Sequence, residues 1–142
     1  SAQRSLAMRE HSSFQIKNKL TNKGFGSDII ESVILEIKNN GFQSDERYTE
    51  EYIRYRQNSG YGSKKIIYEL KSNGISSELI KGSIKNFIDD YDVLSKLAQT
   101  RITDIDLIDD KKLAKYVNNF RSRGFDNNII LKVINKIKNY EE

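Results

Sequence analysis

A short motif occurs three times in this chain of 142 residues, and its copies start fifty residues apart. The copies begin at Gly24, Gly74 and Gly124 and read GFGSDIIESVILEI, GISSELIKGSIKNF and GFDNNIILKVINKI. In each copy an apolar residue follows the glycine, and apolar residues then recur at intervals of three and four. A fixed internal period of this length indicates a fold built from repeated structural units. The repeat therefore constrains the fold more than any single residue does.

Each copy contains the signals that end one helix and start the next. The glycine fits the position just past a helix end, where only glycine adopts a positive φ at little cost. Gly26, Ser76 and Asp126 fit the N-cap of the following helix. The residue before this cap and the one four positions after it are both apolar, which is the spacing of a hydrophobic staple. A tight corner between two helices is therefore expected at three places, with the signature residues Gly24, Phe25, Gly74, Ile75, Gly124 and Phe125.

The segments between the copies are also helical in pattern, and the chain contains no proline, the residue that most often breaks helices. We expect three repeats, at 1–42, 43–90 and 91–142, with three helices in each. The expected helices are residues 2–10, 12–23 and 27–39, then 45–58, 63–73 and 77–89, then 91–102, 110–123 and 127–140. One repeat is too short to bury its apolar face alone, so neighbours should stack around a continuous core. The predicted fold class is all-α, with three tandem three-helix repeats forming one solenoid-like body.

Composition argues against several classes of protein. The chain has no cysteine, which excludes disulfides and thiolate metal sites. No apolar run approaches the ~18 residues of a membrane span, and no signal peptide is visible. His11 is the only histidine and stands at an expected helix start, so neither a familiar nucleophilic triad nor a zinc site can be assembled. We expect no catalytic residue, no cofactor and no membrane partner.

The four aspartates of residues 104–110 raise the question of a calcium site. The segment lacks the glycine and the final glutamate of an EF-hand loop. A solvated connector with helix caps is the better interpretation.

The segment GYGSKK, which starts at Gly60, is not the P-loop pattern. We expect Gly62 or Ser63 to cap the helix that follows. The N-terminus of that helix, with Lys64 and Lys65 beside it, could still receive a phosphate or a carboxylate.

Charge is unevenly spread along the chain, whose net charge is +4. Residues 87–110 hold seven acids against two bases, a net charge of −5, and residues 111–138 hold eight bases against one acid, a net charge of +7. Such asymmetry favours a polyanionic partner. In the middle repeat, basic residues alternate with Tyr48, Tyr52, Tyr55, Tyr61 and Tyr68. This mixture could contact phosphates and stack on nucleic-acid bases; alternatively, the tyrosines lie in the core and the bases pair with neighbouring glutamates. We favour core positions for the tyrosines, while the residues alone leave binding and solvation of the basic side chains open.

The middle repeat resembles the signature of the RecX family, bacterial regulators of the RecA recombinase. The residues that carry this resemblance are Asp45, Tyr52, Arg56, Gly60, Gly62, Ile66, Glu69, Leu70, Gly74 and Ile75. The first repeat is similar to the family's opening unit through Arg9, Ser12, Leu20, Gly24 and Phe25, and the third to its closing unit through Phe120, Arg123, Gly124, Phe125 and Ile130. The resemblance covers essentially the whole chain. The sequence differs from the family pattern at Gln15, where the first unit of the family usually has an acidic residue.

The resemblance implies three tandem three-helix repeats in a curved, elongated body and a non-catalytic function in DNA repair, recombination and the SOS response. It implies a cytoplasmic protein that binds RecA, lies along the groove of the RecA–DNA filament and restrains filament growth, ATPase activity and strand exchange. Single- or double-stranded DNA is a further candidate partner. The resemblance also favours binding for the basic side chains, and the candidate contacts are Arg54, Arg56, Lys64, Lys65, Lys71, Arg121 and Arg123.

Two alternatives come from other classes. Three-helix units with a tight corner are similar to helix-turn-helix folds, which suggests a free-standing DNA-binding module. Against it, no expected helix is rich in Arg, Asn and Gln together, as a recognition helix would be. A helical scaffold for some other protein is the second alternative.

Overall fold

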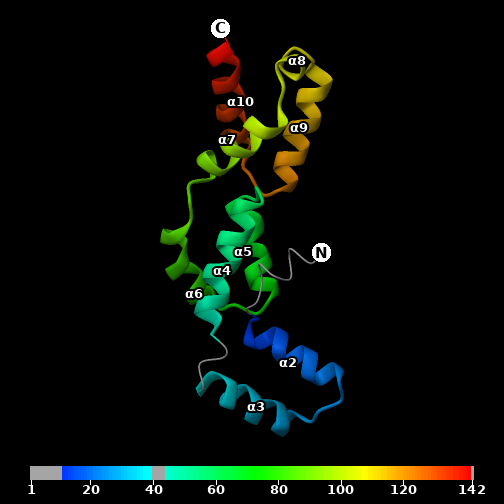
Figure 1. Cartoon of the computed structure of the whole chain (residues 1–142), viewed down its shortest axis with the longest axis vertical. Helices are drawn as coiled ribbons and strands as arrows, with labels where there is room; N and C mark the ends of the chain where they lie inside the picture. The colour runs from blue at the N-terminus through cyan, green and yellow to red at the C-terminus, as the bar shows by residue number, and fades with distance from the viewer. Residues whose placement is uncertain (1–10, 40–43, 142) are drawn as a thin grey trace. The chain divides into compact units, whose positions relative to one another are not determined.

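The structure is a computed structural model that describes residues 11–39 and 44–141. Within these ranges it contains helices and no strand (Figure 1), which confirms the predicted all-α class. The first helices are α2 (Ser13–Asn22), α3 (Ser27–Asn39), α4 (Asp45–Asn58), α5 (Ser63–Ser72) and α6 (Ser77–Ser83), followed by a 3-10 turn at Ile84–Asn86. The helices after this turn are α7 (Asp90–Arg101), α8 (Asp104–Leu107), α9 (Asp110–Ser122) and α10 (Asn127–Glu141).

The chain forms two compact units. Unit 1 consists of Ser1–Tyr55 and Tyr68–Asn86, and unit 2 of Arg56–Ile67 and Phe87–Glu142. The division falls inside α4 and α5, so each of these helices contributes residues to both units.

Most helix bounds agree with the sequence prediction. The helices expected at 27–39 and 45–58 have those bounds. Those expected at 63–73, 110–123 and 127–140 differ by one residue at one end, and those expected at 12–23 and 91–102 differ by one residue at both ends. The helix expected at 2–10 lies outside the described residues. The Ser44 hydroxyl caps α4 by accepting from the amide of Arg47 at 3.2 Å.

One helix end was predicted wrongly, and one short helix was not predicted at all. The helix expected at 77–89 ends at Ser83 and continues only as the 3-10 turn. Gly82 weakens the helix interior, and the Ser83 hydroxyl donates to the carbonyl oxygen of Leu79 at 2.9 Å, a bond that competes with regular helix structure. The one-turn helix α8 was not predicted. Its start is a capping box formed by Thr103 and Asp106, a signal that is present in the sequence TDID.

The three predicted corners share one backbone geometry. At the second, the amide of Gly74 donates to the carbonyl of Lys71 at 3.1 Å, and the amide of Ile75 donates to that of Leu70 at 3.0 Å. Gly74 has a φ of 83°. Equivalent bonds and positive φ values occur at Gly24 and Gly124, so all three corners are Schellman motifs.

At two of these positions, close packing also leaves no room for the Cβ atom of any other residue. A Cβ atom at Gly124 would lie 2.6 Å from the backbone nitrogen of Lys65, and one at Gly74 would collide with Phe14. A Cβ atom at Gly24 would meet nothing within 4 Å. The start of α2 therefore packs against the second corner, and the start of α5 packs against the third.

Each unit has its own buried residues. In unit 1, Tyr48 and Tyr52 are buried, which confirms their predicted core positions. Tyr68, by contrast, is 71% exposed, so its predicted core position is wrong. In unit 2, α10 packs against α7 and α9 (Figure 1), around a core of Val93, Leu94, Ala98, Leu113, Phe120, Phe125, Ile130, Val133 and Ile134.

Candidate interaction surface

Three of the candidate contact residues meet around the ring of Tyr61 in unit 2. Tyr61 lies in the corner between α4 and α5. The guanidinium carbon of Arg56 is 3.6 Å from the ring centroid, that of Arg123 is 4.6 Å away, and the Lys65 ammonium is 5.7 Å away. A cation over an aromatic face is attracted by the ring quadrupole. Folding therefore gathers cations from three chain segments on one tyrosine, and we call Arg56, Tyr61, Lys65 and Arg123 the Tyr61 cluster.

Arg123 also holds the end of α4. Its Nη1 donates to the carbonyl oxygens of Ser59 at 3.0 Å and Gly60 at 3.2 Å. A cation at this place complements the negative end of the helix dipole. Burial lowers the pKa of Arg123, and the charges of Arg101 and Arg56 lower it further. Arg101, at the end of α7, therefore adds to the positive potential here. It was not predicted as part of the site, because its proximity to Arg123 depends on the tertiary fold.

The other candidate contacts lie outside this cluster. Arg54 and Lys71 are exposed residues of unit 1. Arg121 is exposed in unit 2, where its guanidinium donates to the side-chain oxygens of Asn127 at 3.0 Å and Asn118 at 3.2 Å. Arg56 differs from all of these, because only 8% of its surface is exposed. The exposed members are thus available to a partner, whereas Arg56 is part of the fold.

The anion site considered at the start of α5 already holds a carboxylate of the chain itself. The amide of Ser63 donates to Oδ1 of Asp90 at 3.0 Å, and its hydroxyl donates to Oδ2 at 2.6 Å. Lys64 forms an ion pair with Asp126, and the Lys65 ammonium donates to the carbonyl of Ser122 at 3.4 Å. These contacts occupy the groups that the sequence analysis offered to a phosphate.

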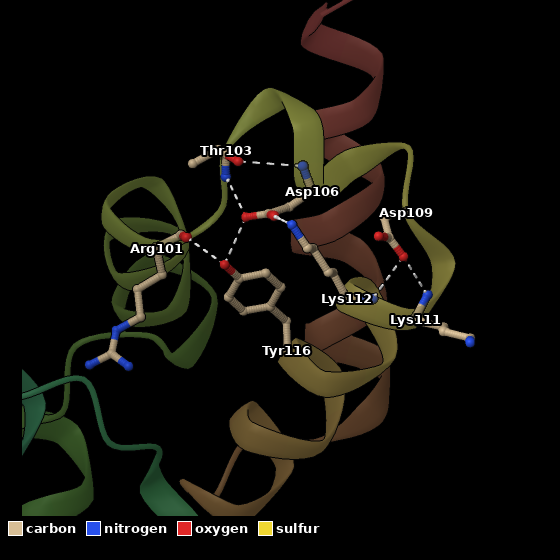
Figure 2. Close-up of polar contacts among 7 residues, drawn as sticks. All are labelled: Arg101, Thr103, Asp106, Asp109, Lys111, Lys112 and Tyr116. Atoms are coloured by element: carbon tan, nitrogen blue, oxygen red, sulfur yellow. Dashed lines mark hydrogen bonds and ion pairs between the residues drawn. The ribbon is translucent and has the colours of Figure 1, made fainter.

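Asp106 is the centre of a polar network between α7, α8 and α9 (Figure 2). Its Oδ2 accepts from the amide of Thr103 at 3.1 Å and from the hydroxyl of Tyr116 at 2.8 Å, and its Oδ1 lies 3.5 Å from the Lys112 ammonium. The Tyr116 hydroxyl also lies 2.7 Å from the carbonyl oxygen of Arg101. The bonds from Thr103 and Tyr116 lower the pKa of Asp106 from 3.8 to about 2.

The acidic connector is therefore only partly the solvated segment that was expected. Asp106 is buried, whereas Asp104 and Asp110 are exposed. Asp109 caps α9 by accepting from the amides of Lys111 at 3.0 Å and Lys112 at 3.2 Å (Figure 2), as predicted for a helix cap. Across the part of the chain that the structure describes, no group of three His, Cys, Asp or Glu residues could hold a metal ion.

A second arrangement of cations with an aromatic ring lies between α7 and α10. Tyr91, Lys132, Asn135, Lys136 and Asn139 line a shallow groove. The Lys136 ammonium is 5.3 Å from the centroid of the Tyr91 ring. These residues were not among the predicted contacts, although two lysines four positions apart within residues 111–138, the segment of net charge +7, were a signal for one basic helix face.

Comparison with known proteins identifies the family. Residues 1–36 match the family model for the first three-helix domain of RecX, and residues 44–82 match the model for its second three-helix domain. The two matches cover 36 and 39 residues, which is 75 of the 142 residues and more than half of the chain. The chain belongs to the RecX family.

Curated RecX proteins are similar over most of their length. The "Regulatory protein RecX" of Legionella pneumophila (strain Corby) is 33% identical over 139 residues, which cover 97% of this chain and 93% of the relative. That of Haemophilus ducreyi is 33% identical over 124 residues, which cover 86% of this chain and 80% of the relative. The crystal structure of RecX from Lactobacillus salivarius has a TM-score of 0.69 and 19% identity, covering 94% of this chain and 93% of the other. This structural likeness supports the RecX fold.

No helix within residues 11–39 and 44–141 combines the length and the apolar character needed to cross a membrane.

Proposed function

We propose that this RecX-family chain is a non-catalytic cytoplasmic regulator that binds RecA and the RecA–DNA filament. In this proposal it inhibits filament growth, RecA's ATPase activity and strand exchange. The observation that carries the proposal is the similarity to regulatory proteins of the RecX family over almost the whole chain. No cofactor takes part.

The distribution of basic side chains supports contact with a negatively charged partner. The Tyr61 cluster concentrates positive charge, to which Arg101 adds. Because its members are distant in sequence, only the folded chain presents the cluster. A concentrated positive potential attracts acidic protein surfaces and phosphates over several ångströms and speeds association. Arg54, Lys71 and Arg121, which are exposed, are the proposed direct contacts, and the more enclosed Arg56, Lys65 and Arg123 set the potential and the local structure. Lys64 is also exposed, but it is paired with Asp126.

Direct binding of DNA is a second proposal, and the groove at Tyr91 favours it. Two lysines and two asparagines line it together with an aromatic ring, and none of these described lining residues is acidic. Lysines can pair with phosphates, and a tyrosine can stack on a base. A free-standing DNA-binding module would bind duplex without RecA, with an affinity that falls steeply as salt rises.

Co-sedimentation with RecA filaments tests the binding step. Filaments assembled on single-stranded DNA should carry the chain into the pellet, and Arg54→Glu with Lys71→Glu should weaken this binding. Glu78→Lys is a control of matched exposure in unit 1, because it changes charge without removing a proposed contact. If the wild-type chain stays in the supernatant at several-fold excess of filament, the proposed function is wrong.

A further inference from the structure

Two isoleucines at α8 are unusually exposed for their type. Ile105 is 70% exposed and Ile108 is 86% exposed. They are three positions apart, the spacing of neighbours on one side of a helical turn. Side chains so exposed contribute little to a core, so folding does not explain why apolar residues stand here.

The turn that carries them is fixed by polar contacts on both sides. Thr103 and Asp106 form the capping box of α8, and the Asp106 carboxylate is bound by the hydroxyl of Tyr116 on α9 (Figure 2). Asp109 then caps α9 directly after the turn. A turn that is already ordered loses less conformational entropy when a partner binds it. The network thus presents the two isoleucines in one arrangement.

Negative charge borders the isoleucine pair. Residues 102–110 contain four aspartates and no basic residue. Asp106 is buried in the network, whereas Asp104 and Asp110 are exposed on either side of the pair. The flanking basic residues are Arg101, Lys111 and Lys112. The side chains of Arg101 and Lys111 point away from Asp106 (Figure 2), and the Lys112 ammonium lies 3.5 Å from the Asp106 carboxylate. This border would repel phosphates, so a nucleic acid is a poor occupant, and an apolar pocket with a basic rim is a complementary one.

We propose that α8 is a docking element for a protein partner. Ile105 and Ile108 enter an apolar pocket on that partner, and Asp104 and Asp110 face basic side chains at the rim of the pocket. This element is separate in chemistry from the Tyr61 cluster, because it is apolar and acidic. The proposal rests on the proposed function for the identity of its probe, the RecA filament.

The test is the dissociation constant of the full chain for RecA filaments on oligo(dT), measured by co-sedimentation. Ile105→Ser with Ile108→Ser should weaken binding ~10-fold or more, as expected when two central apolar contacts are lost. Ile105→Leu with Ile108→Leu should bind nearly as the wild type does. Leu131→Ser is the matched control, because Leu131 is 53% exposed on α10, and it should leave binding unchanged. Asp104→Lys with Asp110→Lys should weaken binding most at low salt, where charge is least screened.

Circular dichroism of each variant checks that the helices are retained. If the wild-type chain binds and the serine pair binds equally well, the docking element is wrong while the proposed function stands. If the wild-type chain does not bind, both are wrong. If the serine pair instead abolishes self-association seen by sedimentation equilibrium, or binding to naked oligo(dT), the occupant is a second copy or a nucleic acid, and the proposal of a partner protein is overturned.

Discussion

The carboxylate of Asp90 accepts two hydrogen bonds from Ser63, one from the amide at 3.0 Å and one from the hydroxyl at 2.6 Å. Asp90 is the first residue of α7, and Ser63 is the first residue of α5. In unit 1, Asp45 binds the amide of Ser13 at 2.9 Å and its hydroxyl at 3.4 Å. A carboxylate at a helix start satisfies an otherwise unpaired amide and complements the helix dipole. Twice, therefore, the first turn of a later helix caps the start of an earlier one, with α4 capping α2 and α7 capping α5.

Removal of this cap should destabilise the protein. Asp90→Ala leaves the amide of Ser63 without its carboxylate, so we expect the free energy of unfolding to fall by about 1–2 kcal/mol. Urea unfolding followed by circular dichroism measures the loss. Asp92→Ala is the control, because Asp92 is exposed on the same helix. Equal effects of the two substitutions would show that the Asp90–Ser63 contact does not stabilise the fold.

Alanine should be tolerated differently at the corner glycines. Gly24 and Gly124 have φ values of 92° and 97°, so alanine at either position is strained by about 1–2 kcal/mol. At Gly124 the new Cβ would also lie 2.6 Å from the backbone of Lys65, whereas at Gly24 it would meet nothing within 4 Å. Gly124→Ala should therefore lower the unfolding midpoint in urea more than Gly24→Ala does. The opposite order would contradict the close packing of the third corner.

The Asp106 network should depend on pH in a defined direction. The pKa of Asp106 in the folded chain is about 2, below the ordinary 3.8. The ionised carboxylate therefore stabilises the fold fully above pH ~4, and this contribution disappears as the pH falls toward 2. Asp106→Asn should be less stable than the wild type at neutral pH, and the difference should shrink below pH ~4. Thermal unfolding at several pH values measures it, with the exposed Asp104→Asn as control. A difference that stays constant from pH 7 to pH 2 would contradict the low pKa.

Substitutions at Arg54 and Arg56 should distinguish a residue that contacts the partner from one that stabilises the fold. Arg56→Glu places an anion in a position that is 8% exposed and removes the cation over Tyr61. We expect it to lower the free energy of unfolding by about 2 kcal/mol or more. Arg54 is exposed, so Arg54→Glu should change it by no more than about 0.5 kcal/mol. Urea unfolding measures both changes in the free energy of unfolding. Similar decreases for the two variants would show that the burial of Arg56 does not make it important for stability. Arg54→Glu is thus the informative variant for filament binding.

The helices and corners were predictable because their signals are local. Gly24, Gly74 and Gly124 supply the positive φ that each helix end needs. Ser76 and Asp109 each cap a helix that starts at the next residue. Such signals do not depend on the rest of the fold. The early end of α6 shows the limit of the pattern, because its apolar periodicity continues past Gly82 and Ser83 while the helix does not.

The arrangement of the candidate surface depends on contacts across the chain. Lys64 and Lys65 follow a helix start and were therefore offered to a phosphate, but Asp90 occupies that start from 27 residues away. Arg123 meets Arg56 and Tyr61 only because the third corner packs on the segment between α4 and α5. Neither relationship has a signature in sequence spacing, so composition and resemblance could indicate basic contacts without showing which of them are exposed.

The DNA-dependent ATPase of RecA tests the central claim most directly. RecA and single-stranded DNA are held at fixed concentrations, and the purified chain is added up to several-fold excess over RecA. Raising the DNA concentration in parallel controls for simple sequestration of DNA. The proposed function predicts that the ATPase rate falls progressively with added chain and stays low when DNA is raised. An unchanged rate at the highest excess, or full recovery with added DNA, would contradict it.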